Sequence, residues 1–146
     1  MKQTKRSNMG FSLVELIIVI AIMAVLLGVL TPRYLKYVEK SRLVGDEALA
    51  DEIRRACDSL VSEPDMQDDL TTGTYTITVL PSGNITISAP DATSKNCFDT
   101  YLKNTLGQDY DTRHLHSKAY AKIEIKFSNT MHPACTIHRV SAGGDN

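Results

Sequence analysis

The hydrophobic pattern of this chain starts with an apolar run directly after a short basic leader. From Phe11 to Leu30, only Ser12, Glu15 and Gly28 interrupt a series of large apolar or alanine side chains. Twenty helical residues span about 30 Å, the thickness of the hydrocarbon layer of a membrane. A carboxylate inside that layer costs about 2.5–3.5 kcal/mol at the centre of a helix and less near its end. The run therefore predicts a membrane-spanning helix in which Glu15 has a functional reason to be present.

The helical pattern continues past the apolar run and becomes amphipathic. Apolar or small residues recur at spacings of three, four or seven, at Leu35, Val38, Gly45, Leu49, Ile53, Ala56 and Leu60. The faces between them carry charges, among them Glu39, Asp46, Glu47, Asp51, Glu52 and Arg55. Pro64 disfavours helical geometry at the residue before it. We expect one helix from Phe11 to Ser62, with its outer half packed on a small domain.

Gly28 and Pro32 weaken this helix near the end of the apolar run. Proline lacks the N–H group that would bond the carbonyl of Gly28, and its ring crowds the same carbonyl. Glycine is itself a poor helix former, by about 1 kcal/mol relative to alanine. The pair predicts a kink or a segment that can unwind; a kink at the membrane exit with no further role is the plainer interpretation.

Alternating residues after the acidic loop predict a hairpin. Tyr75, Ile77 and Val79 alternate with threonines, which is typical of a half-buried strand. A Pro-Ser-Gly-Asn turn at 81–84 follows, and Ile85 begins the returning strand.

The C-terminal half predicts a short helix and two more strands. The helix covers 94–106, with Ser94 as its N-cap and Gly107 at its end. Residues 118–127 alternate strongly, and 135–140 supply an antiparallel partner. The fold class is therefore α+β, a long N-terminal helix packed on a small antiparallel sheet of about four strands.

The junction between leader and apolar run carries a specific motif. The segment Gly10-Phe11-Ser12-Leu13-Val14-Glu15-Leu16-Ile17 resembles the processing site of type IV pilins and pseudopilins, the prepilins with a class III signal. The resemblance implies cleavage between Gly10 and Phe11 by a membrane prepilin peptidase, and N-methylation of Phe11. It also implies that Glu15 guides assembly, that Pro32 bounds a segment that unwinds in the filament, and that the fold is a pilin-like lollipop.

Five segments follow from these patterns. They are a leader peptide (1–10), the transmembrane and assembly half of the helix (11–32), its amphipathic outer half (33–62), the globular αβ-loop, sheet and C-terminal region (63–140) and a flexible tail (141–146).

Two other interpretations of the N-terminus are weaker. A secretory signal has an apolar region of 7–15 residues followed by small residues at the cleavage site. Here the run is longer, and the segment from Leu27 to Pro32 matches that site poorly. A plain membrane anchor explains the length but not Gly10 and Glu15.

Charge argues against a nucleic-acid-binding surface. The chain carries 16 basic and 17 acidic residues. Loss of the leader removes three of the basic ones and leaves 13 against 17, a net charge of −4. Attraction to phosphates needs clustered Lys and Arg instead. We therefore expect no direct nucleic-acid partner.

The cysteines Cys57, Cys97 and Cys135 permit three different single bridges, with one thiol left over. They can equally be small buried hydrophobic residues. Many pilins staple their C-terminal region with a disulfide, so the resemblance implies a bridge between Cys97 and Cys135.

Nothing in the sequence indicates catalysis or a cofactor. His114 and His116 lie on one face of an extended segment, but no third residue completes a metal site, and solvated histidines are expected. Asp65, Asp68 and Asp69 lack the spacing of a calcium loop, and a solvated acidic loop is expected. We expect no enzyme and no resident metal.

The function that these observations predict is that of a structural prepilin subunit, polymerised through its N-terminal helix into a type IV pilus-like filament. Its partners are further copies or related pilins, the prepilin peptidase, the pilus assembly platform protein and the membrane. The precursor is expected in the bacterial cytoplasmic membrane and the mature protein in an extracellular or envelope-spanning filament. Two alternatives remain: a pseudopilin of type II secretion or competence DNA uptake, and a membrane-anchored binding domain that does not polymerise.

Overall fold

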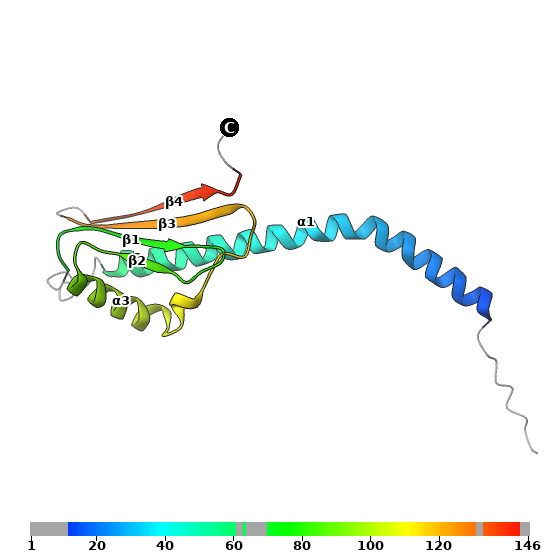
Figure 1. Cartoon of the computed structure of the whole chain (residues 1–146), viewed down its shortest axis with the longest axis horizontal. Coiled ribbons are helices and arrows are strands. Elements are labelled where there is room, and N and C mark those ends of the chain that lie inside the picture. Colours follow the sequence, from blue (N-terminus) through cyan, green and yellow to red (C-terminus); the bar gives the residue numbers. More distant parts are fainter. Residues whose placement is uncertain (1–11, 61–62, 64–69, 131–132, 144–146) are drawn as a thin grey trace, which may run out of the picture. The chain divides into compact units, whose positions relative to one another are not determined.

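The computed structural model describes residues 12–60, 63, 70–130 and 133–143. The chain forms two compact units, residues 1–38 and residues 39–146. The first element, α1 (Leu13–Leu60), contributes its N-terminal part to the first unit and its C-terminal part to the second (Figure 1). The predicted long helix is therefore confirmed from Leu13 to Leu60, and its predicted ends at Phe11 and Ser62 lie outside the described residues.

In the first unit, α1 is helical through both weak positions, so Pro32 does not end the helix. The hydroxyl of Thr31 donates a hydrogen bond to the carbonyl of Leu27, at 2.6 Å. Helical backbone at Gly28 and Pro32 leaves the kink and the unwinding segment as predictions.

The second unit contains a four-stranded antiparallel sheet in the order β2-β1-β3-β4. Its strands are β1 (Gly73–Val79), β2 (Thr86–Ser88), β3 (Tyr120–Asn129) and β4 (Ala134–Ser141). The hairpin of β1 and β2 and the antiparallel pairing of β3 with β4 follow the sequence pattern. The α+β class, with a long helix packed on four antiparallel strands, is confirmed.

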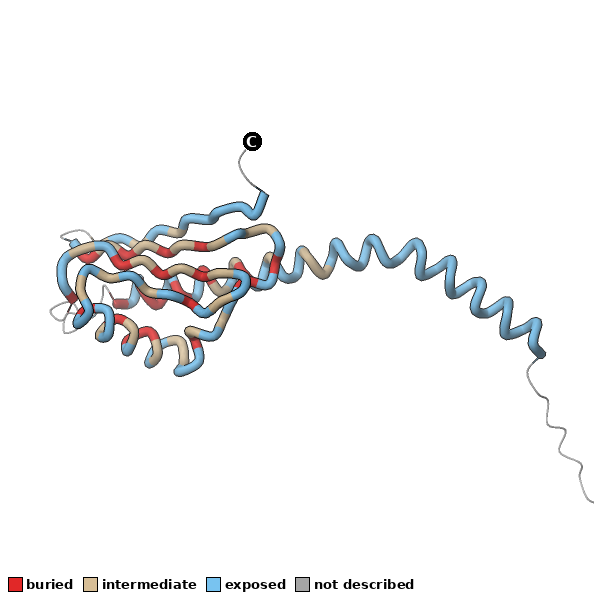
Figure 2. Tube along the Cα trace, in the orientation of Figure 1, coloured by how far each residue is buried: buried red, intermediate tan, exposed pale blue. Residues whose placement is uncertain are grey.

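The hydrophobic core lies on one face of this sheet. Buried residues alternate along β1 and β3, and the register places Tyr75 opposite Phe127, Ile77 opposite Ile125 and Val79 opposite Ile123. Paired residues point to the same face. This face packs against buried side chains of α1 and of the helix α3 (Ala92–Leu106), namely Ala50, Ile53, Ala56, Cys57, Leu60, Phe98 and Leu102. Figure 2 colours the buried positions along these elements red.

The start of α3 differs from the sequence prediction. Its N-cap is Asp91, whose carboxylate accepts hydrogen bonds from the backbone N–H and the hydroxyl of Ser94, both at 2.8 Å. The N-cap assignment to Ser94 was therefore wrong by one turn, because both residues have a side chain able to cap and the helix begins at the earlier one. These bonds, with that of Thr71, lower the pKa of Asp91 to about 2. Gly107, at φ 105°, ends the helix as predicted.

Candidate functional site

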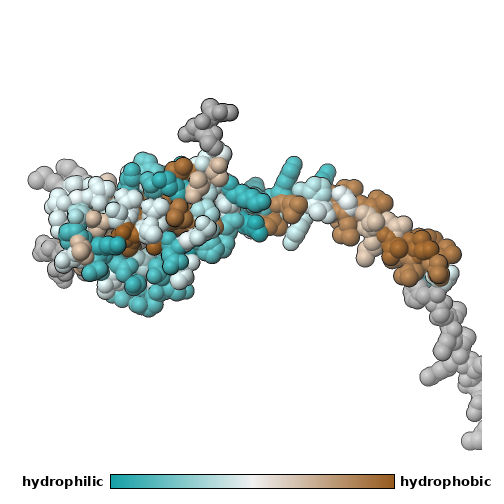
Figure 3. All heavy atoms as spheres, viewed as in Figure 1, coloured by the Kyte–Doolittle hydropathy of each residue, from teal (hydrophilic) through white to brown (hydrophobic). Residues whose placement is uncertain are grey.

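The first unit presents an apolar surface around the whole circumference of α1. Every residue from Leu13 to Leu30 is exposed, and the large apolar side chains among them keep between 48% and 72% of their surface accessible. The hydropathy-coloured view shows this end of the helix as a hydrophobic region (Figure 3). A helix that is apolar on all sides needs a lipid environment or other helices around it.

Length and composition make α1 able to cross a membrane. Among the described residues, α1 is the one helix with that property. An apolar helix of this length near the N-terminus is consistent with an anchor in a membrane.

Glu15 lies in the first turn of α1. Its side chain is exposed, and the backbone N–H of Leu16 already bonds the carbonyl of Ser12. A carboxylate at this end of a helix interacts favourably with the partial positive charge of the unpaired N–H groups. Glu15 is the only ionisable side chain from position 12 to position 32. It can accept an ion pair or a charge-assisted hydrogen bond from a cation brought to this turn. The cleavage residues Gly10 and Phe11 lie outside the described residues.

Gly28 and Pro32 stand one turn apart in the same helix. A Cβ at Gly28 would meet no atom within 4 Å, so no packing in this chain requires glycine there. Glycine instead weakens the helix through its backbone freedom. In addition, Pro32 has no N–H group to donate to the Gly28 carbonyl. The structure thus places both predicted assembly positions on the apolar half of α1, and their role stays a prediction.

Carboxylates of the outer half of α1, which the sequence pattern places between the apolar positions, bind this helix to the C-terminal region. Asp46 is only 1% exposed, and its two oxygens accept the backbone N–H groups of His116, at 2.8 Å, and Ser117, at 2.9 Å. The helix thereby holds the segment that leads into β3. A signal was present in the sequence: Asp46 lies four residues before Ala50 and seven before Ile53, on the buried stripe.

Glu47 makes a second set of contacts, which joins α1 to β3 and β4. Arg139 bonds both oxygens of the Glu47 carboxylate, and the hydroxyl of Tyr120 donates a further hydrogen bond to it. The bond from Arg139 lowers the pKa of Glu47, although partial burial acts in the opposite direction.

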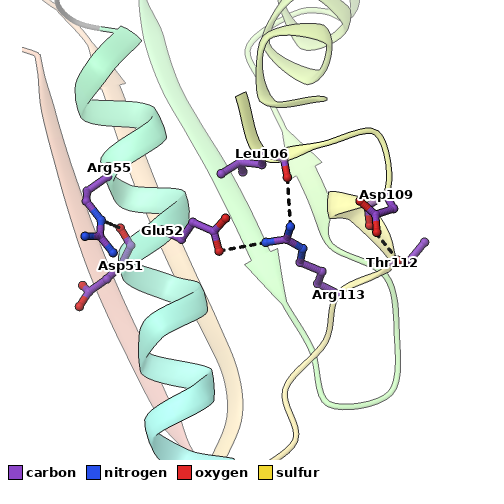
Figure 4. Close-up of polar contacts among 7 residues, drawn as sticks. All are labelled: Asp51, Glu52, Arg55, Leu106, Asp109, Thr112 and Arg113. Atoms are coloured by element: carbon purple, nitrogen blue, oxygen red, sulfur yellow. Dashed lines mark hydrogen bonds and ion pairs between the residues drawn. The ribbon is translucent and has the colours of Figure 1, made fainter. Parts of the chain in front are cut away.

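Two further carboxylates of α1, those of Glu39 and Glu52, also contact the C-terminal region. Glu39 accepts the backbone N–H of Lys118. Glu52 binds Arg113, at 2.9 Å, and the same guanidinium donates to the carbonyl of Leu106, at 3.0 Å (Figure 4). Arg113 thus links α1 to the end of α3. These contacts position elements of the domain and supply no reactive group.

The three cysteines occupy different elements and are present as thiols. Cys57 is fully buried in α1, Cys97 lies in α3, and Cys135 is half-buried in β4. The thiols of Cys57 and Cys135 neighbour each other closely enough for each to shift the pKa of the other. The bridge that the resemblance implied, between Cys97 and Cys135, stays a prediction.

The histidine pair is close but isolated from other metal ligands. The ring centroids of His114 and His116 are 4.6 Å apart. No group of three or more His, Cys, Asp or Glu side chains suited to a metal occurs in the described part of the chain. His132 and the acidic loop at 65–69 lie outside that part.

Comparison with known proteins assigns the N-terminal segment. Residues 5–31 match the family model described as the prokaryotic N-terminal methylation motif, which is the class III signal of type IV pilins and pseudopilins. The chain therefore carries the signal of a type IV pilin-like or pseudopilin precursor. No curated protein and no solved structure matches the chain. The family match therefore covers residues 5–31 and does not extend to the domain that follows.

Proposed function

We propose that this protein is a structural prepilin subunit. The precursor is cleaved between Gly10 and Phe11, methylated at the new N-terminus and polymerised through the first half of α1 into a type IV pilus-like filament. The methylation motif at 5–31 supports the processing step. The single observation that carries the assembly step is the apolar surface of α1 from Leu13 to Leu30, exposed on every side and interrupted by one carboxylate.

The exposed apolar surface gives a physical reason for assembly. In the membrane, lipid chains cover it; in a filament, the same helices of other copies would cover it. Burial is favourable in both environments, so transfer from one to the other changes the hydrophobic free energy little. Packing and electrostatic contacts then decide between storage and assembly.

Glu15 supplies the electrostatic contact in this proposal. Cleavage would create a free, positively charged amine at Phe11, four residues before Glu15. In the filament the amine of one subunit pairs with the Glu15 carboxylate of a neighbour. The pair offsets the cost of keeping a carboxylate in an apolar bundle and sets the register of the incoming subunit.

The methylation motif at 5–31 supports the choice of partners. They are a prepilin peptidase, an assembly platform protein in the cytoplasmic membrane, and further copies of this chain or related pilins. The motif is shared by pseudopilins, so a short envelope filament for protein secretion or DNA uptake is the second candidate. Long sheared surface fibres favour the pilin, and their absence in a strain with a secretion pore favours the pseudopilin.

The test is to express the full chain in a host with a prepilin peptidase and an assembly system. We expect mass spectrometry of the mature protein to find N-methyl-Phe11 as the first residue, and the sheared fraction to contain the protein. An intact leader, with the protein extracted by detergent as a monomer, would overturn the proposal in favour of an anchored binding domain. A Gly10→Asp variant is the matched control and should accumulate uncut.

A further inference from the structure

Two cysteines far apart in the sequence meet at the interface between helix and sheet. Cys57 belongs to the buried stripe of α1, between Ile53 and Leu60. Cys135 lies opposite Phe127 in the register of β4 and β3. Phe127 faces the core, and Cys135 therefore points to the same face.

The burial pattern of β4 gives the same result independently. Cys135 and Ile137 are half-buried and pack against the core, whereas Ala134, Thr136 and His138 between and beside them are exposed. Cys57 is a member of the core cluster against which they pack. The two thiols are close enough for each to shift the pKa of the other, so the elements that carry them already lie side by side.

The two thiols differ in reactivity. The hydrogen bond from Cys57 lowers the pKa of Cys135, which is only half-buried. The hydrogen bond to Cys135, together with burial, raises the pKa of Cys57 far above its ordinary value. The thiolate is the nucleophile in disulfide exchange. Cys135 is half-buried and Cys57 is fully buried, so Cys135 is the member of the pair that an oxidant can reach from solvent.

We propose that Cys57 and Cys135 form an intramolecular disulfide that ties α1 to the edge strand β4. The oxidant is a disulfide compound, either a small one or a protein disulfide. This proposal depends on the thiol pair alone and does not rest on the proposed function.

The reaction consists of two exchanges. The thiolate of Cys135 attacks one sulfur of the oxidant, whose S–S bond breaks and releases a thiolate. The thiol of Cys57 then gives its proton to that thiolate and attacks the Cys135 sulfur, which releases the second thiolate. Two cysteine thiols are oxidised and one disulfide is reduced to two thiols. The sequence needs attack from solvent only at Cys135, which matches the burial of Cys57.

The bridge has a definite structural consequence. β4 pairs with β3 on one side only, and among the described strands it forms one edge of the sheet. A bond between positions 57 and 135 closes a long loop and fixes this edge strand to the helix, which restricts the unfolded chain strongly. Oxidised protein should therefore be much more stable than reduced protein.

The test uses the full chain purified in detergent and treated with glutathione disulfide. We expect the unreduced protein to be about 2 Da lighter than the reduced protein, and peptide mapping to join Cys57 to Cys135. The Cys97→Ala variant should keep both results, and Cys135→Ser should lose both. Mapping of wild-type protein needs no variant, so a folding defect in Cys135→Ser cannot hide the answer. Three alkylatable thiols after oxidation, or a bridge that contains Cys97, would overturn the proposal.

Stability gives a second measurement. Reduction should lower the melting temperature of wild-type and Cys97→Ala protein by about 10 °C or more, and should leave that of Cys135→Ser unchanged. Equal melting temperatures for oxidised and reduced wild-type protein would contradict a bridge that ties the helix to the sheet.

Discussion

Arg139 in β4 binds both carboxylate oxygens of Glu47 in α1, although 92 residues separate the two in the sequence. The closest contact, from Nη2 to Oε2, is 2.6 Å. Both side chains remain about one-third exposed, so solvent screens their attraction. The value of the pair lies in its planar, two-bond geometry, which fixes the register of the helix on the sheet.

Arg139→Lys should lower the free energy of unfolding by about 0.5 kcal/mol, because lysine keeps the charge but cannot make the two parallel bonds. Urea unfolding of the full chain in detergent, followed by tyrosine fluorescence, measures this difference. Arg42→Lys is the control, since Arg42 makes only a 3.8 Å contact with Glu39. A larger loss at position 42 than at 139 would contradict the assignment.

Glu47→Gln should reduce the loss of stability in acid. The pKa of Glu47 is lowered in the folded state, first by the bond from Arg139 and further by that from Tyr120. Its contribution is therefore complete above the ordinary pKa of 4.5 and disappears as the pH falls through the folded-state value. Unfolding free energies of wild type and variant, measured from pH 7 to pH 3, should converge toward the acid end. A constant difference across this range would contradict the expectation.

Asp46→Ala should cost about 2–3 kcal/mol, because the buried backbone N–H of Ser117 and the partly buried N–H of His116 lose their acceptor. This is larger than the expected effect of Glu52→Ala, whose ion pair with Arg113 is solvent-exposed. The same urea experiment compares the two variants. Equal decreases in the free energy of unfolding would show that Asp46 is not the main residue that holds the segment before β3.

Glu15→Val should remove filaments while leaving the processed protein in the membrane. The substitution makes insertion easier, because it removes a carboxylate from the apolar segment, but it also removes the proposed partner of the Phe11 amine. Glu15→Asp is the matched control and should keep part of the assembly. Shearing and electron microscopy give the yield. A normal yield from Glu15→Val would show that apolar burial alone drives polymerisation.

Gly28→Ala should reduce filament yield without affecting cleavage. Alanine fits, since no atom lies within 4 Å of the new Cβ, and it strengthens the helix by about 1 kcal/mol against unwinding. Gly45→Ala is an unusually close control, because it also lies in α1 with open space around it. If both variants assembled equally well, the proposed unwinding at 28–32 would be contradicted.

The strands and the long helix could be predicted because their signals are local. Tyr75, Ile77 and Val79 alternate with threonines, and each of the three is fully buried. The polar contacts between α1 and the C-terminal region could not be predicted in the same way. Asp46 repeats with the buried stripe, but its charge indicated a solvated position. Only the arrival of the N–H groups of His116 and Ser117, 70 and 71 residues later, makes its burial favourable.

The cysteine pairing shows the same limit. Residue spacing left three bridges open, and the alternation of β4 did not reveal which helix its inner face would meet. The packing of α1 on that face places Cys135 beside Cys57. Which partners meet is thus decided by tertiary packing, whereas which residues face inward is decided by local alternation.

The contacts between α1 and the C-terminal region join residues far apart in the sequence, and this separation determines how late in synthesis they can form. The helix that is synthesised first is held by residues near positions 116–118 and by Arg139, which are synthesised much later. Contacts between residues distant in sequence form slowly, because the entropy cost of closing a large loop must be met before the contacts add any stability. Under the proposed export, the inner stripe of α1 from Ala50 to Leu60 is therefore not completely covered until almost the entire chain has crossed the membrane. On this proposal, a newly exported chain is vulnerable to proteolysis and association until the last strand, β4, has emerged and paired.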